Sequence, residues 1–181
     1  TLPMANSDPD TRAQADQRIL DRLRSVPGVL GAAAMSGLPP NRTPDAIATP
    51  IENYTSDDGK PFTIDYYQFV MGDYFGTMGI PIVAGRGFER TDNASQGKVA
   101  IVNETLAKRI WKGQNPIGRR LRPPGGSFGA TDDVWHTVIG VAKDVRQRGV
   151  DRPAGTELYV SLDQHGVAPP SMNVVMRTTL P

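Results

Sequence analysis

Apolar and polar positions alternate along the chain with periods that predict both helices and strands. The clearest unit starts at Val99–Val102, a short β-branched run that is typical of a buried strand. Asn103 follows as a predicted N-cap, and Leu106 with Ile110 forms an i,i+4 pair on one helical face. Gly113 then predicts the end of the helix. The stretch therefore predicts a strand, a helix and a turn.

A longer helix is predicted near the N-terminus. Asp8-Pro9 combines a capping residue with proline at the first helical position, so the helix is expected to run from about Pro9 to Val26. Its inner stripe is apolar except at Asp16, and Pro27-Gly28 ends it. Such a helix is typical of one that packs on a sheet.

Further strands are predicted where β-rich or small apolar runs lie between turn residues. These runs are Val29–Ser36, Pro50–Tyr54, Phe62–Met71, Trp135–Val145, Leu158–Leu162 and Met172–Thr178. Phe62–Met71 is interpreted as one strand with aromatic residues on both faces, and a helical turn is expected at Asp73–Met78. Val29–Ser36 is rich in alanine, so its small side chains would let a helix pack closely over it.

The amino-acid composition excludes several classes of function. The chain has 181 residues, a formal net charge of +1 and no cysteine. The near-zero charge gives no electrostatic case for binding nucleic acid or an anionic membrane. The lack of cysteine excludes disulfides, thiolate metal sites and a cysteine nucleophile. No apolar run approaches the ~20 residues that span a bilayer.

The candidate catalytic and metal-binding motifs are weak. Gly85-Arg86-Gly87 lacks the third glycine of a dinucleotide fingerprint, so a tight turn is predicted instead. His136 and His165 are too few for a three-histidine site, and Asp57-Asp58 and Asp132-Asp133 lack EF-hand spacing. No Gly-x-Ser-x-Gly nucleophile motif occurs. We therefore predict no catalytic, cofactor-binding or metal-binding residue, and no enzyme activity.

An ordered set of motifs nevertheless resembles a known family. The motifs are Asp73-Tyr74-Phe75, Met78-Gly79-Ile80-Pro81, Gly85-Arg86-Gly87-Phe88 with Asp92, Val99–Glu104, Asn115-Pro116-Ile117-Gly118-Arg119, Val138-Ile139-Gly140-Val141 with Asp144, and Glu157-Leu158-Tyr159-Val160 with Gln164. Together they resemble the MacB-like periplasmic core domain, the large extracytoplasmic loop of FtsX-like ABC transporter permeases.

The resemblance implies an α+β fold with two subdomains. Residues 1–93 would start a porter-like split βαβ unit, residues 94–170 would form an inserted sabre-like β-rich unit with one helix, and residues 171–181 would return to the porter-like unit as a truncated strand. We expect no single sheet to span both units. In a ferredoxin-like order the returning strand would run antiparallel to Val29–Ser36, and the two chain ends would lie close together.

The function that the resemblance implies is a non-catalytic, extracytoplasmic (periplasmic) domain of a bacterial inner-membrane permease. It would relay conformational change from the membrane and ATPase parts to export, efflux or signalling. Expected partners are its own transmembrane helices, a second permease subunit, a cytoplasmic ATPase and a periplasmic adaptor, with no cofactor and no nucleic acid. The isolated chain is expected to be monomeric and to bind no ATP.

An alternative function remains open from the residues themselves. The chain could be a soluble extracytoplasmic module that binds a ligand or peptide. The aromatic side chains of Tyr66, Tyr67, Phe69, Tyr74 and Phe75 would then line its cleft.

Overall fold

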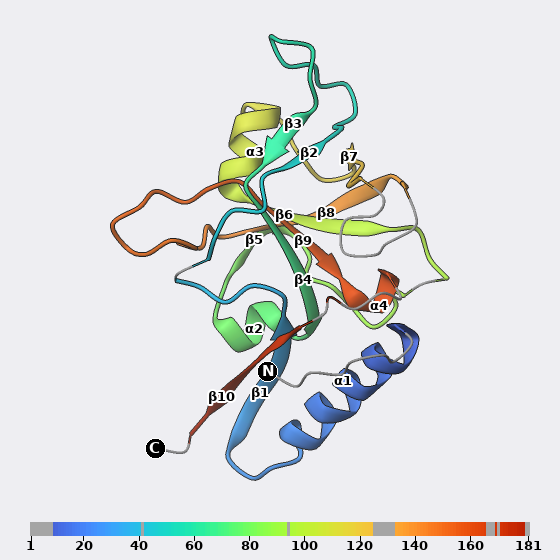
Figure 1. Cartoon of the computed structure of the whole chain (residues 1–181), viewed down its shortest axis with the longest axis vertical. Helices are drawn as coiled ribbons and strands as arrows, with labels where there is room; N and C mark the ends of the chain where they lie inside the picture. The colour runs from blue at the N-terminus through green and yellow to red at the C-terminus, as the bar shows by residue number, and fades with distance from the viewer. Residues whose placement is uncertain are drawn as a thin grey trace.

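Helices and strands alternate irregularly along the chain, which gives an α+β fold dominated by one large mixed sheet (Figure 1). The computed structural model describes residues 9–40, 42–93, 95–124, 133–165, 169 and 171–179. Its elements are α1 (Pro9–Arg24), β1 (Val29–Met35), β2 (Ile47–Thr49), β3 (Phe62–Ile64), β4 (Tyr66–Gly72), α2 (Tyr74–Met78), β5 (Ile82–Gly85), β6 (Val99–Asn103), α3 (Glu104–Trp111), β7 (Arg120–Leu121), β8 (His136–Ala142), β9 (Glu157–Ser161), α4 (Leu162–His165) and β10 (Asn173–Thr178).

The strands of the large sheet follow the order β10-β1-β4-β9-β6-β8-β5, with β7 added beside β8. β4 and β9 pair in parallel, as do β6 and β8, whereas the other pairs are antiparallel. The prediction that no single sheet spans both units is therefore wrong. The reason is that every residue of β9, and every residue of β4 before Gly72, is buried, so these strands belong at the centre of a sheet.

One end of the sheet extends away from the rest. β1 pairs with β10 along its length, from Val29 opposite Thr178 to Met35 opposite Asn173. It pairs with β4 only over residues 33–35. We call α1, β1, α2 and β10 the arm, and β5 to β9 with α3 the body (Figure 1). The antiparallel pairing of the returning strand with β1 confirms that prediction.

The alanine-rich sequence of β1 allows helices to pack on both of its faces. Ala32 and Ala34 share a hydrophobic cluster with Leu20 of α1. Ala33 and Met35 lie in a second cluster with the aromatic residues of α2. This alternation is the period of two expected of a strand that is covered on both sides.

Two local predictions are wrong. The run Phe62–Met71 is two strands, because the chain turns at Asp65, whose carboxylate accepts hydrogen bonds from the backbone and hydroxyl of Thr156 at 2.8 Å each. β3 then pairs with β2 in a separate two-stranded sheet. The strand expected at Pro50–Tyr54 is β2 instead, and Ile51 makes only an isolated bridge to Leu121.

The predicted strand–helix unit at residue 99 is confirmed. Asn103 caps α3, since its side-chain oxygen accepts a hydrogen bond from the Leu106 backbone at 3.0 Å. The helix ends one residue earlier than expected, with Lys112 in the left-handed conformation (φ 48°) and Gly113 also at positive φ. Thr1–Pro3 lies outside the described residues, so the predicted closeness of the chain ends stays a prediction.

Candidate functional site

β4 joins the arm to the body, because it lies between β1 of the arm and β9 of the body. The register of β4 with β9 runs from Tyr66 opposite Glu157 to Val70 opposite Ser161. A cluster of buried polar side chains lies at the first end of this strand pair, and an open cleft lies at the other end. We treat this junction as the candidate functional site, because it joins the two units that the sequence predicts.

The buried polar cluster consists of Arg42, Gln68, Tyr74, Gln147, Glu157 and Tyr159. Arg42 is its positive charge, with 8% of its side chain exposed. Its guanidinium donates to Gln68 at 2.5 Å and to Asp45 at 2.6 Å, and it also donates to the Tyr67 carbonyl. The Arg42 Nη1 atom lies 3.7 Å from Glu157 Oε1. A loop that follows β1 is thereby tied to strands β4 and β9.

Glu157 is the most unusual member of this cluster. Its side chain is fully buried, and Oε1 accepts a hydrogen bond from Gln147 Nε2 at 2.7 Å. Burial raises the pKa of Glu157 to about 7, although Gln147 and Arg42 oppose the shift. Among the described residues, Glu157 Oε2, Gln147 Oε1 and the hydroxyls of Tyr74 and Tyr159 have no hydrogen-bond partner. Buried polar atoms without a partner are rare in folded proteins, so four of them in one cluster set this site apart from an ordinary core.

Aromatic contacts connect the same cluster to the arm. The Tyr74 ring on α2 lies 5.9 Å from the Tyr159 ring on β9, and the Phe75 ring lies 5.0 Å from it, measured between centroids. Burial raises the pKa of both tyrosines, so both are neutral hydroxyls. α2 therefore packs directly on β9, the strand of the body that lies beside β4.

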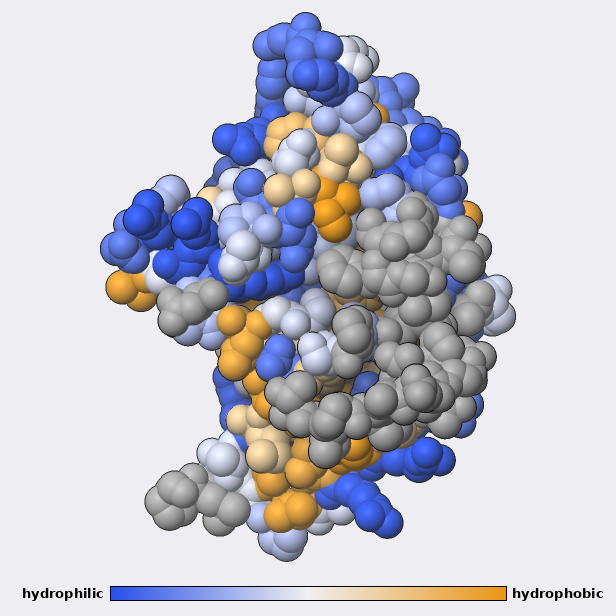
Figure 2. Space-filling view, viewed as in Figure 1, coloured by the Kyte–Doolittle hydropathy of each residue, from blue (hydrophilic) through white to orange (hydrophobic). Residues whose placement is uncertain are grey.

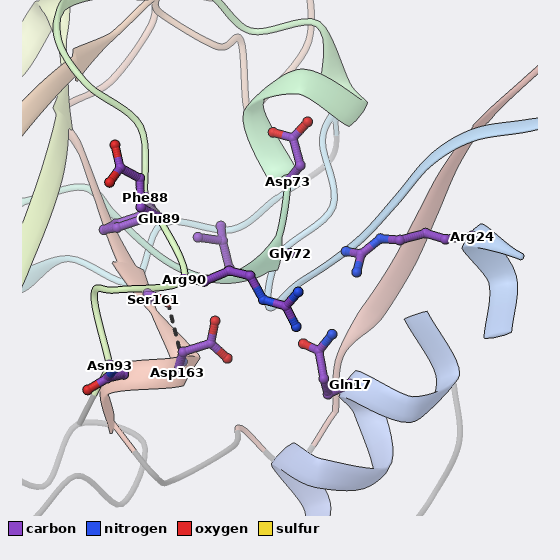
Figure 3. Close-up of a pocket in the computed structure, with 11 residues that line it drawn as sticks. Gln17, Arg24, Gly72, Asp73, Phe88, Glu89, Arg90, Asn93, Ser161 and Asp163 are labelled. Atoms are coloured by element: carbon purple, nitrogen blue, oxygen red, sulfur yellow. Dashed lines mark hydrogen bonds between the residues drawn. The ribbon is translucent and has the colours of Figure 1, made fainter. Parts of the chain in front are cut away.

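The cleft at the other end of the junction has a volume of about 580 Å³ (Figure 3). Gln17 and Arg24 of α1 form its arm side. The segment after β5 and the end of β9 form the opposite side, with α4 following. The residues of that side are Phe88, Glu89, Arg90, Asn93, Ser161 and Asp163, and Val70, Gly72 and Asp73 complete the lining.

Charges of both signs face this cleft. Arg24 is held in place, because its guanidinium donates to the Ala32 carbonyl at 2.7 and 3.2 Å and to Asp21 at 3.1 Å. Figure 3 shows Arg90 extending toward Asp163 and Gln17. The surrounding protein raises the pKa of Asp163, and the attraction of Arg90 and Arg24 partly offsets this. The cleft is thus a polar space between arm and body.

The residues that carried the family resemblance have structural roles here. Asp73 caps α2, accepting from the Gly76 backbone at 3.0 Å. Gly85 has φ +69°, and a Cβ there would lie 2.1 Å from the Ile139 carbonyl of the neighbouring strand. Asn103 accepts from the Glu157 backbone at 2.9 Å and donates to the Gly155 carbonyl at 2.8 Å. Asp73, Gly85 and Asn103 therefore hold the local backbone of the fold in place.

The aromatic cleft proposed from the sequence is wrong. Tyr66, Tyr67, Phe69, Tyr74 and Phe75 are all buried, with at most 7% exposed. Tyr67, Phe69, Tyr74 and Phe75 lie in the two hydrophobic clusters of the sheet, and the Tyr66 ring lies under the Arg42 guanidinium. The three β4 residues are enclosed because β4 is buried on both faces, and the two α2 residues because α2 packs on the sheet. None of them lines the cleft.

The candidate metal residues are dispersed. His136 is buried, which lowers its pKa to about 4, and Asp58 lies in a turn where it accepts from Ser56 at 2.6 Å. The side chain of His165 and all of Asp132 lie outside the described residues. Within the described part of the chain, no group of three His, Asp or Glu side chains could hold a metal ion. The expected absence of cofactors and catalytic residues stays a prediction.

Sequence reasoning missed Arg42, Gln147 and the cleft residues Arg24, Arg90 and Asp163. Their positions in loops or on an amphipathic helix gave no signal. Glu157 did carry one, because an acidic residue opens the apolar run Glu157-Leu158-Tyr159-Val160. A carboxylate in a strand that is buried on both faces must have partners, and those partners define the cluster.

Comparison with known proteins gives the family. The family model described as the MacB-like periplasmic core domain matches residues 3–179. A search of curated proteins found no match. Among solved structures, the chain resembles the periplasmic region of MacB from Actinobacillus actinomycetemcomitans, with 17% identity and a TM-score of 0.59. That alignment covers 90% of this chain and 64% of the other.

A second solved structure supports the same fold. The extracellular domain of the noncanonic ABC-type transporter YknZ from Gram-positive bacteria aligns with 16% identity and a TM-score of 0.56, over 91% of this chain and 73% of the other. Among the described residues, no helix combines the length and apolar character that crossing a membrane requires. The family match spans nearly the whole sequence, and the chain therefore belongs to the MacB-like periplasmic core domain family.

Proposed function

We propose that this domain is a non-catalytic relay, in which the arm and the body move relative to one another about the β4–β9 junction. The motion would carry conformational change from the membrane and ATPase parts of a permease to export or signalling on the periplasmic side. The proposed partners are the permease's own transmembrane helices, a second permease subunit, a cytoplasmic ATPase and a periplasmic adaptor.

The assignment to an ABC transporter permease follows from the family match. The chain is an extracytoplasmic domain of the MacB- and FtsX-like ABC transporter permeases. It spans 64% of the MacB periplasmic region that it resembles, so the activity and the partners of the whole protein belong to the proposal.

The position of β4 is the observation that supports the relay most strongly. β4 pairs with β1 of the arm on one side and with β9 of the body on the other. The arm pairs with β4 over only three residues of β1, and the cleft separates α1 from the body at the same level. Because the β1–β4 contact is short and lies beside an open cleft, rotation of the arm would break few hydrogen bonds between strands, while the packing of α2 on Tyr159 would have to rearrange.

The surface of the arm suits attachment to another apolar structure. Leu30, Val174 and Met176 are 65%, 45% and 52% exposed on the two strands of the arm. Figure 2 shows apolar side chains gathered at this end of the molecule, over β1 and β10. Contiguous exposed apolar side chains commonly mark contact with a membrane or a partner. We assign this surface to the transmembrane helices of the permease.

We also propose the division of the sequence into moving parts: residues 1–93 with 171–181 as the porter-like part, and residues 94–170 as the sabre-like part. The arm lies within the first part. β5 comes from the first part and pairs with β8 of the second, so the connection at residues 82–93 has to accommodate the motion.

Distances between spin labels test the relay. The sequence contains no cysteine, so Arg18→Cys on α1 and Thr91→Cys beyond the cleft would be the only labelled sites in this domain. In the intact permease, ATP should shift the distance distribution between these two labels. A matched pair within the body, Val83→Cys with Lys108→Cys, should give an unchanged distribution. If the arm–body distance also stays fixed through the ATP cycle, the relay is wrong.

The charged cleft favours a second candidate function, the binding of a ligand or peptide. Under that function, a set of dipeptides should raise the thermal unfolding temperature of the domain in a saturable way, and Arg90→Ala should abolish the effect. Dipeptides that stabilise the wild type and the Arg90→Ala variant equally, or neither of them, would exclude the cleft as such a site.

A further inference from the structure

The buried polar cluster crosses the junction and contains one carboxyl group whose neighbours do not satisfy it. Arg42, Gln68 and Tyr74 come from the part of the chain that includes the arm, whereas Gln147 and Glu157 come from the part that includes the body. The contact between Arg42 and Glu157 therefore joins the two parts. We call the arrangement of β4 beside β9 in this structure the closed junction. The geometry of the contact decides which charge state of Glu157 this closed junction prefers.

Most of the charge of Arg42 is already neutralised by another group. Its ion pair with Asp45 measures 2.6 Å, whereas its Nη1 atom is 3.7 Å from the Glu157 carboxylate. The same guanidinium also donates to Gln68 and to the Tyr67 carbonyl. An ionised Glu157 thus has one close hydrogen bond, from Gln147, a looser contact with the Tyr159 hydroxyl, and a distant shared cation. A buried carboxylate needs closer compensation than this.

A neutral Glu157 fits the same surroundings better. Protonation of Oε2, which has no partner among the described residues, would turn it into a donor. The unpaired oxygen atoms of Gln147 and Tyr159 are the acceptors available in the cluster. Protonation therefore adds a donor where the closed junction has unused acceptors, and it removes a charge from a fully buried site.

We propose that Glu157 is a proton-controlled contact between the two parts of the domain: the protonated carboxyl stabilises the closed β4–β9 junction, and the ionised carboxylate loosens it. The inference deepens the proposed relay by adding a regulator to its junction. It can be tested on the isolated chain without ATP, so a negative spin-label experiment would leave it standing.

Every element packed around Glu157 contributes to its titration. The titratable and charged groups that face it are Arg42 with Asp45 from the loop after β1, Tyr66 on β4, Tyr74 on α2, Asp144 after β8, and Tyr159 on β9 itself. Burial and the charge of Asp144 favour the neutral form of Glu157, whereas Gln147, Arg42 and the Tyr159 hydroxyl favour the ionised form. The tyrosines remain neutral over the pH range in which the carboxyl titrates, because burial raises the pKa of each.

The sign of the pH effect follows from these surroundings. The pKa of Glu157 is raised from 4.5 in the unfolded chain to about 7 in the fold, so the folded state binds the proton more tightly. The stabilisation is complete below pH 4.5 and is lost as the pH rises through 7. Between about pH 6 and pH 8 the unfolding equilibrium constant should rise roughly tenfold from this group alone.

The experiment compares urea unfolding of the wild type with that of Glu157→Gln at the two pH values. Glutamine has the shape of the protonated acid and does not titrate, so the variant should lack the roughly tenfold change. His136 makes the same pH-dependent contribution to the stability of both proteins, so this contribution cancels when the two are compared. Glu52→Gln makes the same chemical change at the surface ion pair with Arg120 and should behave like the wild type.

Hydrogen exchange locates the effect. After correction for intrinsic rates, amides of β4 and β9 in the wild type should exchange faster at the higher pH, and those of Glu157→Gln should not. If Glu157→Gln retains the full pH dependence, or if the faster exchange lies elsewhere, the proposal is wrong. Should the variant fail to fold, carbon NMR of the wild-type carboxyl decides: titration near pH 7 supports the proposal, and titration near pH 4.5 overturns it.

Discussion

Asp92 accepts two hydrogen bonds from the guanidinium of Arg86, at 2.6 and 2.8 Å, and a third from the Glu89 backbone at 2.8 Å. The carboxylate of Asp92 is nearly buried, and its hydrogen bonds to Arg86 hold its pKa below the usual range. This bidentate pair closes the segment that forms one side of the cleft.

The first prediction concerns this pair. Asp92→Asn should destabilise the domain by about 1–3 kcal/mol, because a charge-assisted bidentate contact is lost at a mostly buried site. Urea unfolding measures the change, and faster hydrogen exchange over residues 86–93 should accompany it. Asp58→Asn removes an exposed carboxylate and should leave the stability nearly unchanged. Equal losses of stability in the two variants would contradict a stabilising role for the Arg86–Asp92 pair.

The second prediction separates the two glycines of Gly85-Arg86-Gly87. Gly85→Ala should destabilise the fold by at least about 2 kcal/mol, since the new Cβ would meet the Ile139 carbonyl in a left-handed backbone conformation. Gly87→Ala should be nearly neutral, because no atom lies within 4 Å of its Cβ position. Thermal unfolding of both variants provides the comparison. Similar losses at both glycines would show that the β5–β8 contact is not the constraint.

The third prediction concerns acid stability. The buried His136 has its pKa lowered from 6.5 to about 4, so the neutral imidazole belongs to the fold. Its contribution to stability is present above pH 6.5 and is lost as the pH falls toward 4, by roughly 2–4 kcal/mol in total. Proton or nitrogen NMR should show an imidazole that stays neutral until near pH 4. A midpoint near 6.5 would contradict its burial.

The fourth prediction compares two helix caps. Asn103→Ala should cost about 2–3 kcal/mol, because it removes the cap of α3 together with the hydrogen bonds to Gly155 and Glu157. Asp73→Ala removes only the exposed cap of α2 and should cost about 1 kcal/mol. Denaturant unfolding measures both. If the two costs are equal, the additional bonds of Asn103 contribute nothing to stability.

Local patterns in the sequence predicted the elements well. Proline at the start of α1, Asn103 before α3 and the Gly-Pro breaks all have their effect within a few residues, so the bounds of those elements were close. Neither the short α4 nor β5 was predicted, and of β5 only its last residue, Gly85, lies in the predicted turn. Neither element is long enough to show the periodic recurrence of apolar residues from which a helix or strand is predicted.

Pairing between distant strands could not be read in the same way. Nothing in Tyr66–Gly72 specifies that its neighbour is Glu157–Ser161 and not another strand with the same apolar character. The wrong prediction that no single sheet spans both units arose because this pairing was not foreseen. The cleft and the buried polar cluster depend on this pairing, which is why only the acidic residue at the start of β9 hinted at either of them.

The parallel pairing of β4 with β9 also constrains how the chain can fold during synthesis. Residue 66 leaves the ribosome long before residue 157, its partner, so β4 has no neighbour on that edge while the body is being made. β1 likewise has no neighbour on its other edge until β10, the last strand of the described residues, has been made. A nascent chain that stalls between these points would present two apolar strand edges to the solvent, and such edges favour aggregation. β10 is made after every strand of the body, so β1 gains this neighbour only once the strands of the body have left the ribosome.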